Sequence, residues 1–226
     1  MSERQRDLSE IYDRQYEWRK KDGWRGWFQD ETLAHIFRNL DESVCELAPA
    51  GSKLLELGCG AGDQSLYLAA KGYQVTGIEL SAEAVIWATE KAMERNLQVD
   101  FFVEDARSLR SIPNEQFDVV LDGHCWHFIT DKDDRRSFLN TAHRVLKNEG
   151  HLIIYTVCND VGELVGFDPV TRIQSFEDRQ VTYIGRDVDL TKEIESNGFT
   201  IVKNWIVPKP DNNSADVYIS IAKKLS

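Results

Sequence analysis

The sharpest chemical signal in the chain is the segment 56–62, ELGCGAG, which places three glycines at alternate positions after a short apolar run. Glycine is needed where the backbone turns sharply, or where a ligand must approach the main chain with no Cβ in the way. The helical pattern that follows offers free N–H groups and a partial positive charge at its start. The segment therefore predicts a ligand-binding turn between a buried strand and a helix.

Two acids follow at the ends of the next two predicted strands. Glu79 lies 17 residues after Gly62, and a carboxylate there can accept hydrogen bonds from both ribose hydroxyls of a nucleoside. Asp105 can accept from an exocyclic amine, although the alternative of an acid in an exposed loop stays open. Strand, glycine turn, helix, strand and terminal acid in this order predict a nucleoside site.

A second polar turn, DGHCWH at 122–127, follows the strand predicted over 117–121. Open α/β sheets deliver functional groups at the carboxyl ends of their strands, so this turn is predicted to line the pocket. His124 or His127 can remove a proton, because a neutral imidazole titrates near working pH. The alternative is that both are hydrogen-bonded loop residues. No metal is predicted, since a structural zinc needs four ligands and the turn offers three.

Short apolar runs alternate with amphipathic helical patterns through the middle of the chain. Asp30 and Ser81 are predicted to cap two of the helices, and Gly150 is predicted to end a third. This alternation predicts an α/β fold with a doubly wound, mostly parallel sheet of seven strands and helices on both faces. Strands are predicted at 53–57, 73–78, 99–103, 117–121 and 151–157, and helices at 30–47, 63–71, from 82 onward and at 132–147.

The last third of the chain has a different pattern. Residues 159–186 carry few periodic apolar positions and are predicted to form an insertion, followed by a helix at 188–196. Two further strands, 199–207 and 217–222, are joined by a connection too short for a crossover helix, which predicts an antiparallel C-terminal edge hairpin. One domain over 1–226 is expected, with a helical, aromatic cap over 1–47.

Composition limits the function classes. The chain has 226 residues, with 38 acidic against 27 basic side chains and a net charge of −11, which argues against a nucleic-acid substrate. No window of 18 uncharged apolar residues is present, so a membrane-spanning helix is not predicted. The amino-terminal segment lacks the apolar stretch of a secretory signal, and the four scattered cysteines are expected to be reduced thiols, which predicts a cytoplasmic protein. The oligomeric state is not predicted.

The turn resembles motif I of the class I S-adenosylmethionine-dependent methyltransferases, in which an acid, one residue and three alternate glycines match residues 56–62. The resemblance extends from about residue 53 to residue 157. It implies S-adenosylmethionine as cofactor and S-adenosylhomocysteine as product, with the turn at the methionine part, Glu79 at the ribose and Asp105 beside the adenine. The implied cofactor-binding residues are Glu56, Gly58, Cys59, Gly60, Gly62, Glu79, Leu80, Asp105, Ala106, Asp122 and Gly123.

A nicotinamide-dependent dehydrogenase is the nearest competing interpretation. Its fingerprint separates the second and third glycines by two residues, whereas Gly60 and Gly62 are separated by one. Glu56 is also badly placed beside a diphosphate. The methyltransferase interpretation is therefore preferred.

For the acceptor side, the resemblance implies catalytic roles for Asp122 and His127, and His124 is the other candidate proton acceptor in this turn. It also implies that the aromatic segment 12–28 folds over the cofactor, where aromatic faces can enclose a sulfonium through cation–π attraction. Plain packing of a helix is the alternative. The expected reaction is in-line transfer of a methyl group to N, O or S of a small molecule; the alternatives are a protein or peptide side-chain methyltransferase and a non-catalytic cofactor-binding partner subunit. The predicted substrate and lid residues are Tyr12, Tyr16, Trp18, Trp27 and Trp126.

Overall fold

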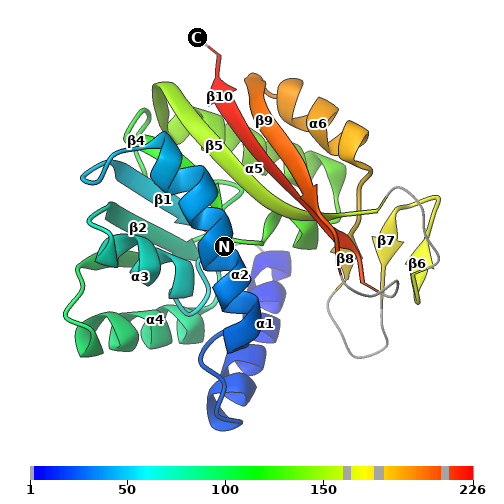
Figure 1. Cartoon of the computed structure of the whole chain (residues 1–226). Helices are drawn as coiled ribbons and strands as arrows, with labels where there is room; N and C mark the ends of the chain where they lie inside the picture. The colour runs from blue at the N-terminus through cyan, green and yellow to red at the C-terminus, as the bar shows by residue number, and fades with distance from the viewer. Residues whose placement is uncertain (1–2, 160–163, 176–180, 210–213, 226) are drawn as a thin grey trace.

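A seven-stranded sheet forms the centre of the molecule in the computed structural model, which describes residues 3–159, 164–175, 181–209 and 214–225 (Figure 1). The strand order is β3-β2-β1-β4-β5-β10-β9. The first five strands are parallel, and β10 runs antiparallel to both of its neighbours, which confirms the predicted sheet and its edge hairpin. The strands are β1 Lys53–Leu57, β2 Gln74–Glu79, β3 Val99–Val103, β4 Phe117–Asp122, β5 Leu146–Cys158, β9 Phe199–Val207 and β10 Asp216–Lys224.

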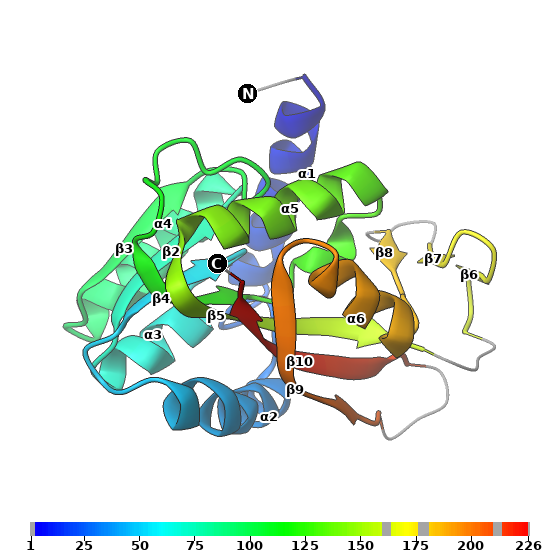
Figure 2. The ribbon, with the colours of Figure 1, turned by 90° about the horizontal axis from the view of Figure 1, so that it is seen from above.

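Helices cover both faces of this sheet (Figure 2). Side chains alternate across each strand, so Leu54 and Val119 pack with α2 and α3, while Leu55 and Val120 pack with α5 and α6. The core is therefore divided into two apolar layers. The helices are α1 Glu3–Lys21, α2 Asp30–Leu40 with a π-helical turn Asp41–Cys45, α3 Asp63–Ala70, α4 Ala82–Glu94, a 3-10 turn Trp126–Phe128, α5 Lys132–Val145 and α6 Asp187–Glu195.

The helix ends agree with the sequence in part. The predicted cap at Ser81 is confirmed, because its hydroxyl accepts a hydrogen bond from the Ala84 amide at 3.1 Å. The predicted cap at Asp30 is wrong: Gln29 holds the cap position, and Asp30 lies in the first turn, where the helix dipole favours an acid. The predicted terminator Gly150 is also wrong. Helix α5 ends at Val145, and Gly150 lies within β5.

A cause for the early end of α5 lies in the preceding loop. The amides of Glu115 and Gln116 donate to the carbonyls of Arg144 and Val145 at 3.0 and 2.8 Å. These bonds satisfy two of the carbonyl groups that a helix leaves open at its carboxyl end, so no glycine cap is required there.

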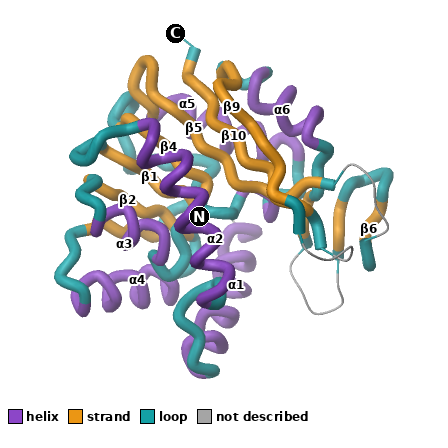
Figure 3. The backbone as a smooth tube through the Cα atoms, viewed as in Figure 1, coloured by secondary structure: helices purple, strands orange, loops and turns teal. Residues whose placement is uncertain are grey.

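The region predicted as an insertion contains a small antiparallel sheet beside the main one (Figure 3). Its strands are β6 Phe167–Asp168, β7 Ile173–Gln174 and β8 Thr182–Tyr183. Strands of two residues are too short to give a periodic apolar signal, which is why the sequence predicts an irregular segment here. The remaining parts of 159–186, at 160–163 and 176–180, lie outside the described residues.

Helix α1 lies across the edge where the parallel strands end (Figure 1). It is attached to α4: Asp13 accepts hydrogen bonds from the Ser81 hydroxyl at 2.6 Å and from the Glu83 amide at 3.2 Å. Lys20 forms an ion pair with Glu90 at 2.5 Å. The carboxyl edge of the sheet is therefore covered by the amino-terminal segment. No helix in the described residues combines the length and apolar content needed to span a membrane.

Candidate active site

A cavity of about 560 Å³ opens at the carboxyl edge of the sheet, under α1. The turns after β1, β2, β3 and β4 all contribute to its wall, as expected for a ligand site in an open α/β sheet. The predicted cofactor-binding residues that line it are Gly58, Cys59, Gly60, Glu79, Leu80, Asp105, Ala106 and Gly123. Glu56, Gly62 and Asp122 do not line it.

The glycine turn directs its amides into the protein. Gly58 and Cys59 donate to the Ile78 carbonyl at 2.8 and 2.9 Å, and Gly62 donates to the Cys59 carbonyl at 2.9 Å. Gly60 donates to the Glu79 carboxylate at 3.0 Å. These four amides are therefore not free to cradle an anion, and at Gly58 and Gly60 the turn offers a ligand backbone without a side chain.

The helix after the turn is equally unsuited to a diphosphate. Asp63 is its first residue and lies in the cavity wall, where it puts a carboxylate at the helix start. Lys91 pairs with that carboxylate at 2.5 Å and also donates to the Ala61 carbonyl at 2.8 Å. Helix starts that bind phosphate present free amides to it. The structure thus agrees with the preference against a dinucleotide.

Glu79 is held by main-chain amides. Its side chain is 8% exposed, and Oε1 accepts from the amides of Leu80 and Ser81 at 2.7 and 3.0 Å. Burial raises the pKa of Glu79, while its bonds to these amides and to that of Gly60 lower it. A carboxylate has about four acceptor positions, so three amides leave capacity for about one further strong hydrogen bond. The acid is oriented toward the cavity with part of its acceptor capacity unused.

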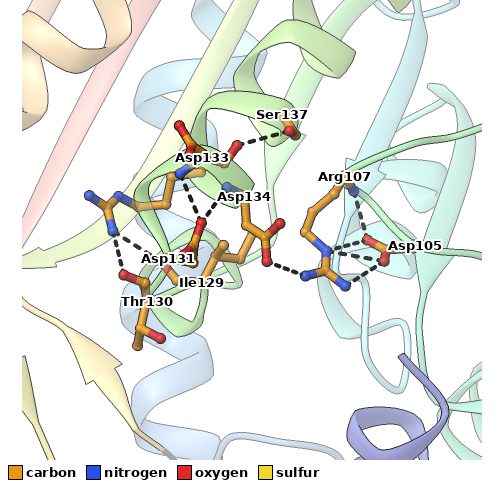
Figure 4. A network of polar contacts seen from close by, with 9 residues as sticks. Asp105, Arg107, Ile129, Thr130, Asp131, Asp133, Asp134 and Ser137 are labelled. Atoms are coloured by element: carbon orange, nitrogen blue, oxygen red, sulfur yellow. Dashed lines mark hydrogen bonds and ion pairs between the residues drawn. The ribbon is translucent and has the colours of Figure 1, made fainter. Parts of the chain in front are cut away.

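Asp105 forms an ion pair with Arg107, a residue that the sequence did not predict at the site (Figure 4). Nε and Nη2 of Arg107 donate hydrogen bonds to the Asp105 carboxylate at 2.9 and 2.7 Å, and Nη1 donates to Asp134 of α5 at 2.6 Å. The side-chain hydrogen bond to Asp105 is the largest cause that raises the pKa of Arg107. The only sequence signal was a basic residue two positions after the acid. Any ligand amine must share the Asp105 oxygens with this guanidinium.

Glu56 lies beneath the turn instead of in the cavity wall. Its side chain is fully buried and accepts hydrogen bonds from the side-chain amide of Gln64 at 3.1 Å and from the Ser65 hydroxyl. Burial, the largest cause, raises the pKa of Glu56 from 4.5 to about 8. Glu56 thus ties β1 to the start of α3, and its predicted contact with the methionine part of the cofactor stays a prediction.

Gly62 also has a packing role. A Cβ at this position would lie 2.9 Å from the Ala88 Cβ and 2.9 Å from the Phe101 ring, and the backbone has a φ of +79°. This glycine lets α4 and β3 approach the turn closely. Its place in the motif therefore reflects neighbouring protein atoms, not contact with the cavity.

The three predicted catalytic residues in the turn after β4 lie in different environments. Asp122 is fully buried, and its Oδ1 accepts from the amides of Cys125 and Trp126 at 2.9 and 3.0 Å. Burial raises the pKa of Asp122 to about 7. Asp122 thus fixes the shape of the turn behind the cavity wall. Trp126 is fully buried in the core and does not line the cavity, in contrast to its predicted place near the substrate.

His124 lines the cavity, whereas His127 does not. The His124 backbone is left-handed, with a φ of +65°, and its ring stacks on Tyr155 at 5.3 Å and meets the edge of Phe28 at 5.3 Å. Its Nε2 has no hydrogen-bond partner among the described residues. Burial lowers the pKa of His124 to about 4 and that of His127 to about 3, so both rings are neutral at pH 7. His127 packs against Phe128 at 4.2 Å.

The aromatic segment contributes both packing and cavity wall. Tyr12, Tyr16 and Trp27 line the cavity, and the ring centroids of Tyr16 and Trp27 are 5.4 Å apart. Arg19 lies over the Trp27 ring at 3.9 Å. Trp18 lies outside the cavity and is 53% exposed, because a helical position two residues after Tyr16 points away from it. The packing interpretation of this segment is therefore confirmed, and its predicted contact with the cofactor stays a prediction.

Comparison with known proteins identifies relatives of this architecture. A family model described as a methyltransferase domain matches residues 55–154. The ubiquinone biosynthesis O-methyltransferase of Xanthomonas oryzae pv. oryzae is 32% identical over 118 residues, which cover 52% of this chain and 48% of that protein. The chain thus spans about half the length of the curated relatives it matches.

Solved structures with the same fold cover more of the chain. The 1,6-didemethyltoxoflavin-N1-methyltransferase of Burkholderia thailandensis, solved with 1,6-didemethyltoxoflavin and S-adenosylhomocysteine, has a TM-score of 0.74 at 19% identity and covers 98% of this chain and 90% of its own. A SAM-dependent methyltransferase of Methanosarcina mazei has a TM-score of 0.71 at 23% identity, covering 80% and 96%. These likenesses establish the fold.

Replacing Gly62 by alanine is expected to destabilise the protein more than replacing Gly51. Both glycines have positive φ, but nothing lies within 4 Å of a Cβ at Gly51. The left-handed backbone costs each variant about 1–2 kcal/mol, and overpacking adds about 1–3 kcal/mol at Gly62. Urea unfolding of the two variants measures this difference. Equal losses would show that the contacts with Ala88 and Phe101 do not restrict this position.

Glu56 is expected to make the protein less stable as pH rises. The folded protein keeps this acid protonated up to about pH 8, whereas an exposed glutamic acid ionises near 4.5. Stability from this group is complete below pH 4.5 and is lost between there and pH 8, with a limiting slope of about 1.4 kcal/mol per pH unit. Unfolding free energies measured across this range should fall less steeply for Glu56→Gln. An unchanged slope would contradict the shift.

Proposed function

We propose that this chain, whose residues 55–154 match a methyltransferase domain, is a class I S-adenosylmethionine-dependent methyltransferase that transfers a methyl group from S-adenosylmethionine to N, O or S of a small molecule. The observation that carries the proposal is the cavity at the carboxyl edge. It combines a glycine turn, four of whose amides bond within the protein, with an acid at the end of β2 and another after β3. S-Adenosylhomocysteine is the product that would leave.

The cavity wall fits the parts of this cofactor. Glu79 has acceptor capacity for a ribose hydroxyl, and Asp105 with Ala106 offers a carboxylate and backbone to the adenine. The aromatic faces of Tyr12 and Tyr16 suit a cation, whereas the side chain of Arg19 already lies over the Trp27 ring. When bound, the cofactor supplies a methyl group activated by a sulfonium. The chain itself binds, orients and excludes water, and fixed orientation can contribute up to about 7–11 kcal/mol to barrier lowering.

His124 is the residue proposed to accept the proton of the acceptor. Its ring lines the cavity and is neutral, so it can take a proton without first losing one. Asp122 and His127 are proposed to act on it indirectly. Asp122 holds the turn on which His124 sits, and His127 packs beneath it against Phe128.

A small acceptor is favoured over a protein side chain by the position of α1, which lies across the cavity edge and is attached to α4. The Xanthomonas oryzae and Burkholderia thailandensis relatives are likewise named for ubiquinone biosynthesis and for 1,6-didemethyltoxoflavin. A reducing compartment such as the cytoplasm is proposed from the wide and irregular spacing of the four cysteines.

Calorimetry with S-adenosylhomocysteine tests the cofactor assignment, and a single-turnover assay tests the reaction. In the assay, the protein is mixed with methyl-labelled S-adenosylmethionine and a cell extract divided by molecular weight. Binding with label in the low-molecular-weight fraction is the expected result. Binding without transfer to either fraction would favour a non-catalytic cofactor-binding subunit, and label in the high-molecular-weight fraction would favour a protein acceptor.

His124→Asn is expected to lower kcat by about 10²–10⁴-fold, while the affinity for S-adenosylhomocysteine stays within about threefold, because the variant removes a proton acceptor and leaves the cofactor wall intact. His35→Asn is the control. It changes an exposed histidine of α2 outside the cavity and should leave kcat and the affinity for S-adenosylhomocysteine unchanged. Normal turnover in His124→Asn would remove this residue from the mechanism.

A further inference from the structure

Part of the cavity wall does not belong to the turns that meet the cofactor. We call this part the acceptor region and define it by Trp27, Phe28, Leu33, His124, Phe128 and Ile129. These residues come from the segment before α2, from α2 itself and from the turn and 3-10 turn after β4. No residue of the turns after β2 and β3 is among them, so this region lies beyond the nucleoside end of the cavity.

Aromatic rings in contact with one another build the acceptor region. Trp27 and Phe128 meet edge to face with centroids 6.0 Å apart, and Phe28 meets His124 at 5.3 Å. Tyr155 backs the His124 ring in a stacked arrangement. Rings held in this way present flat apolar surfaces at fixed positions, which favour a planar apolar ligand.

The charged groups along the cavity wall already have partners among the described residues. Asp63 is paired with Lys91, Arg107 with both Asp105 and Asp134, and Glu79 accepts three backbone amides. Among the described lining residues, Arg107 is the one with a permanently positive side chain, and two carboxylates neutralise its charge. A ligand carboxylate or phosphate entering the acceptor region would therefore lose its water without gaining a free cation, which is a large cost.

One polar side chain in this apolar wall, that of His124, can form a hydrogen bond with a ligand. His124 contributes a neutral imidazole, and its Nε2 has no hydrogen-bond partner in the part of the chain that the structure describes. A neutral imidazole keeps one ring nitrogen as an acceptor, so the His124 ring, which lines the cavity, can take a hydrogen bond from a ligand. A hydroxyl or N–H group on the ligand supplies the missing donor.

We infer that the methyl acceptor is a neutral, planar aromatic molecule with one hydroxyl or ring N–H group that donates to His124. This rests on the proposed methyl transfer and narrows its substrate class. The rings of Trp27, Phe28 and Phe128 enclose the aromatic body of the acceptor, and the donor group is the one that is methylated. Acceptors carrying a carboxylate, a phosphate or an ammonium group are disfavoured.

Three probes on one scaffold test the charge requirement: 2-naphthol, 2-naphthoate and 2-naphthylmethylammonium. Each is titrated calorimetrically into the full chain saturated with S-adenosylhomocysteine at about pH 7.5, where the three are neutral, anionic and cationic. 2-Naphthol is expected to bind at least about tenfold more tightly than either charged probe. Equal or tighter binding of a charged probe, or no binding of 2-naphthol, overturns the inference.

Two phenylalanine variants locate the binding. Phe128→Ala removes a ring of the acceptor region and is expected to weaken 2-naphthol binding by at least about fivefold. Phe37→Ala removes a ring that stacks on Tyr67 at 4.2 Å outside the cavity and should leave this binding unchanged. Equal effects of the two variants would also overturn the inference. If the wild-type chain does not bind S-adenosylhomocysteine at all, the proposed function is refuted instead, so the two failures can be told apart.

Discussion

The hydrogen bond between the Gly60 amide and the Glu79 carboxylate is the contact on which the site depends. It joins the turn after β1 to the end of β2, at a place where a side chain on residue 60 would collide with the Tyr16 hydroxyl. The amides of Leu80 and Ser81 hold the other carboxylate oxygen. One buried acid thereby fixes two strand ends and the start of α4. It can do so because main-chain amides, which carry no net charge, stabilise the ionised form without neutralising it.

Three acidic side chains near the cavity have different roles because their environments differ. Glu56 is buried under the turn and stays protonated until about pH 8. Glu79 reaches the cavity with part of its acceptor capacity unused. Asp105 lies in the wall with its charge shared by Arg107. A cationic ligand in this cavity therefore meets fewer free negative charges than the sequence suggests, which limits tight binding of its ground state.

Periodicity predicted the mostly parallel seven-stranded sheet with its antiparallel edge hairpin, and residue type predicted the Ser81 cap, because each depends on local pattern. The roles of Glu56, Gly62 and Asp122 could not be predicted in this way. Whether a residue at a strand end faces the cavity or the layer beneath depends on contacts with α3, β3 and the 3-10 turn, which are distant in sequence or lack a periodic signal. Arg107 was missed for a similar reason, since its partner Asp134 lies 27 residues away.

The attachment of α1 to α4 bears on how molecules enter and leave. Asp13 supplements the amino-terminal cap of α4, and Tyr16 packs with Ala84 and Trp87 of the same helix. A movement of α1 away from α4 would break these contacts together and expose an apolar surface. The energy of these contacts therefore sets how readily the amino-terminal segment can leave the cavity edge.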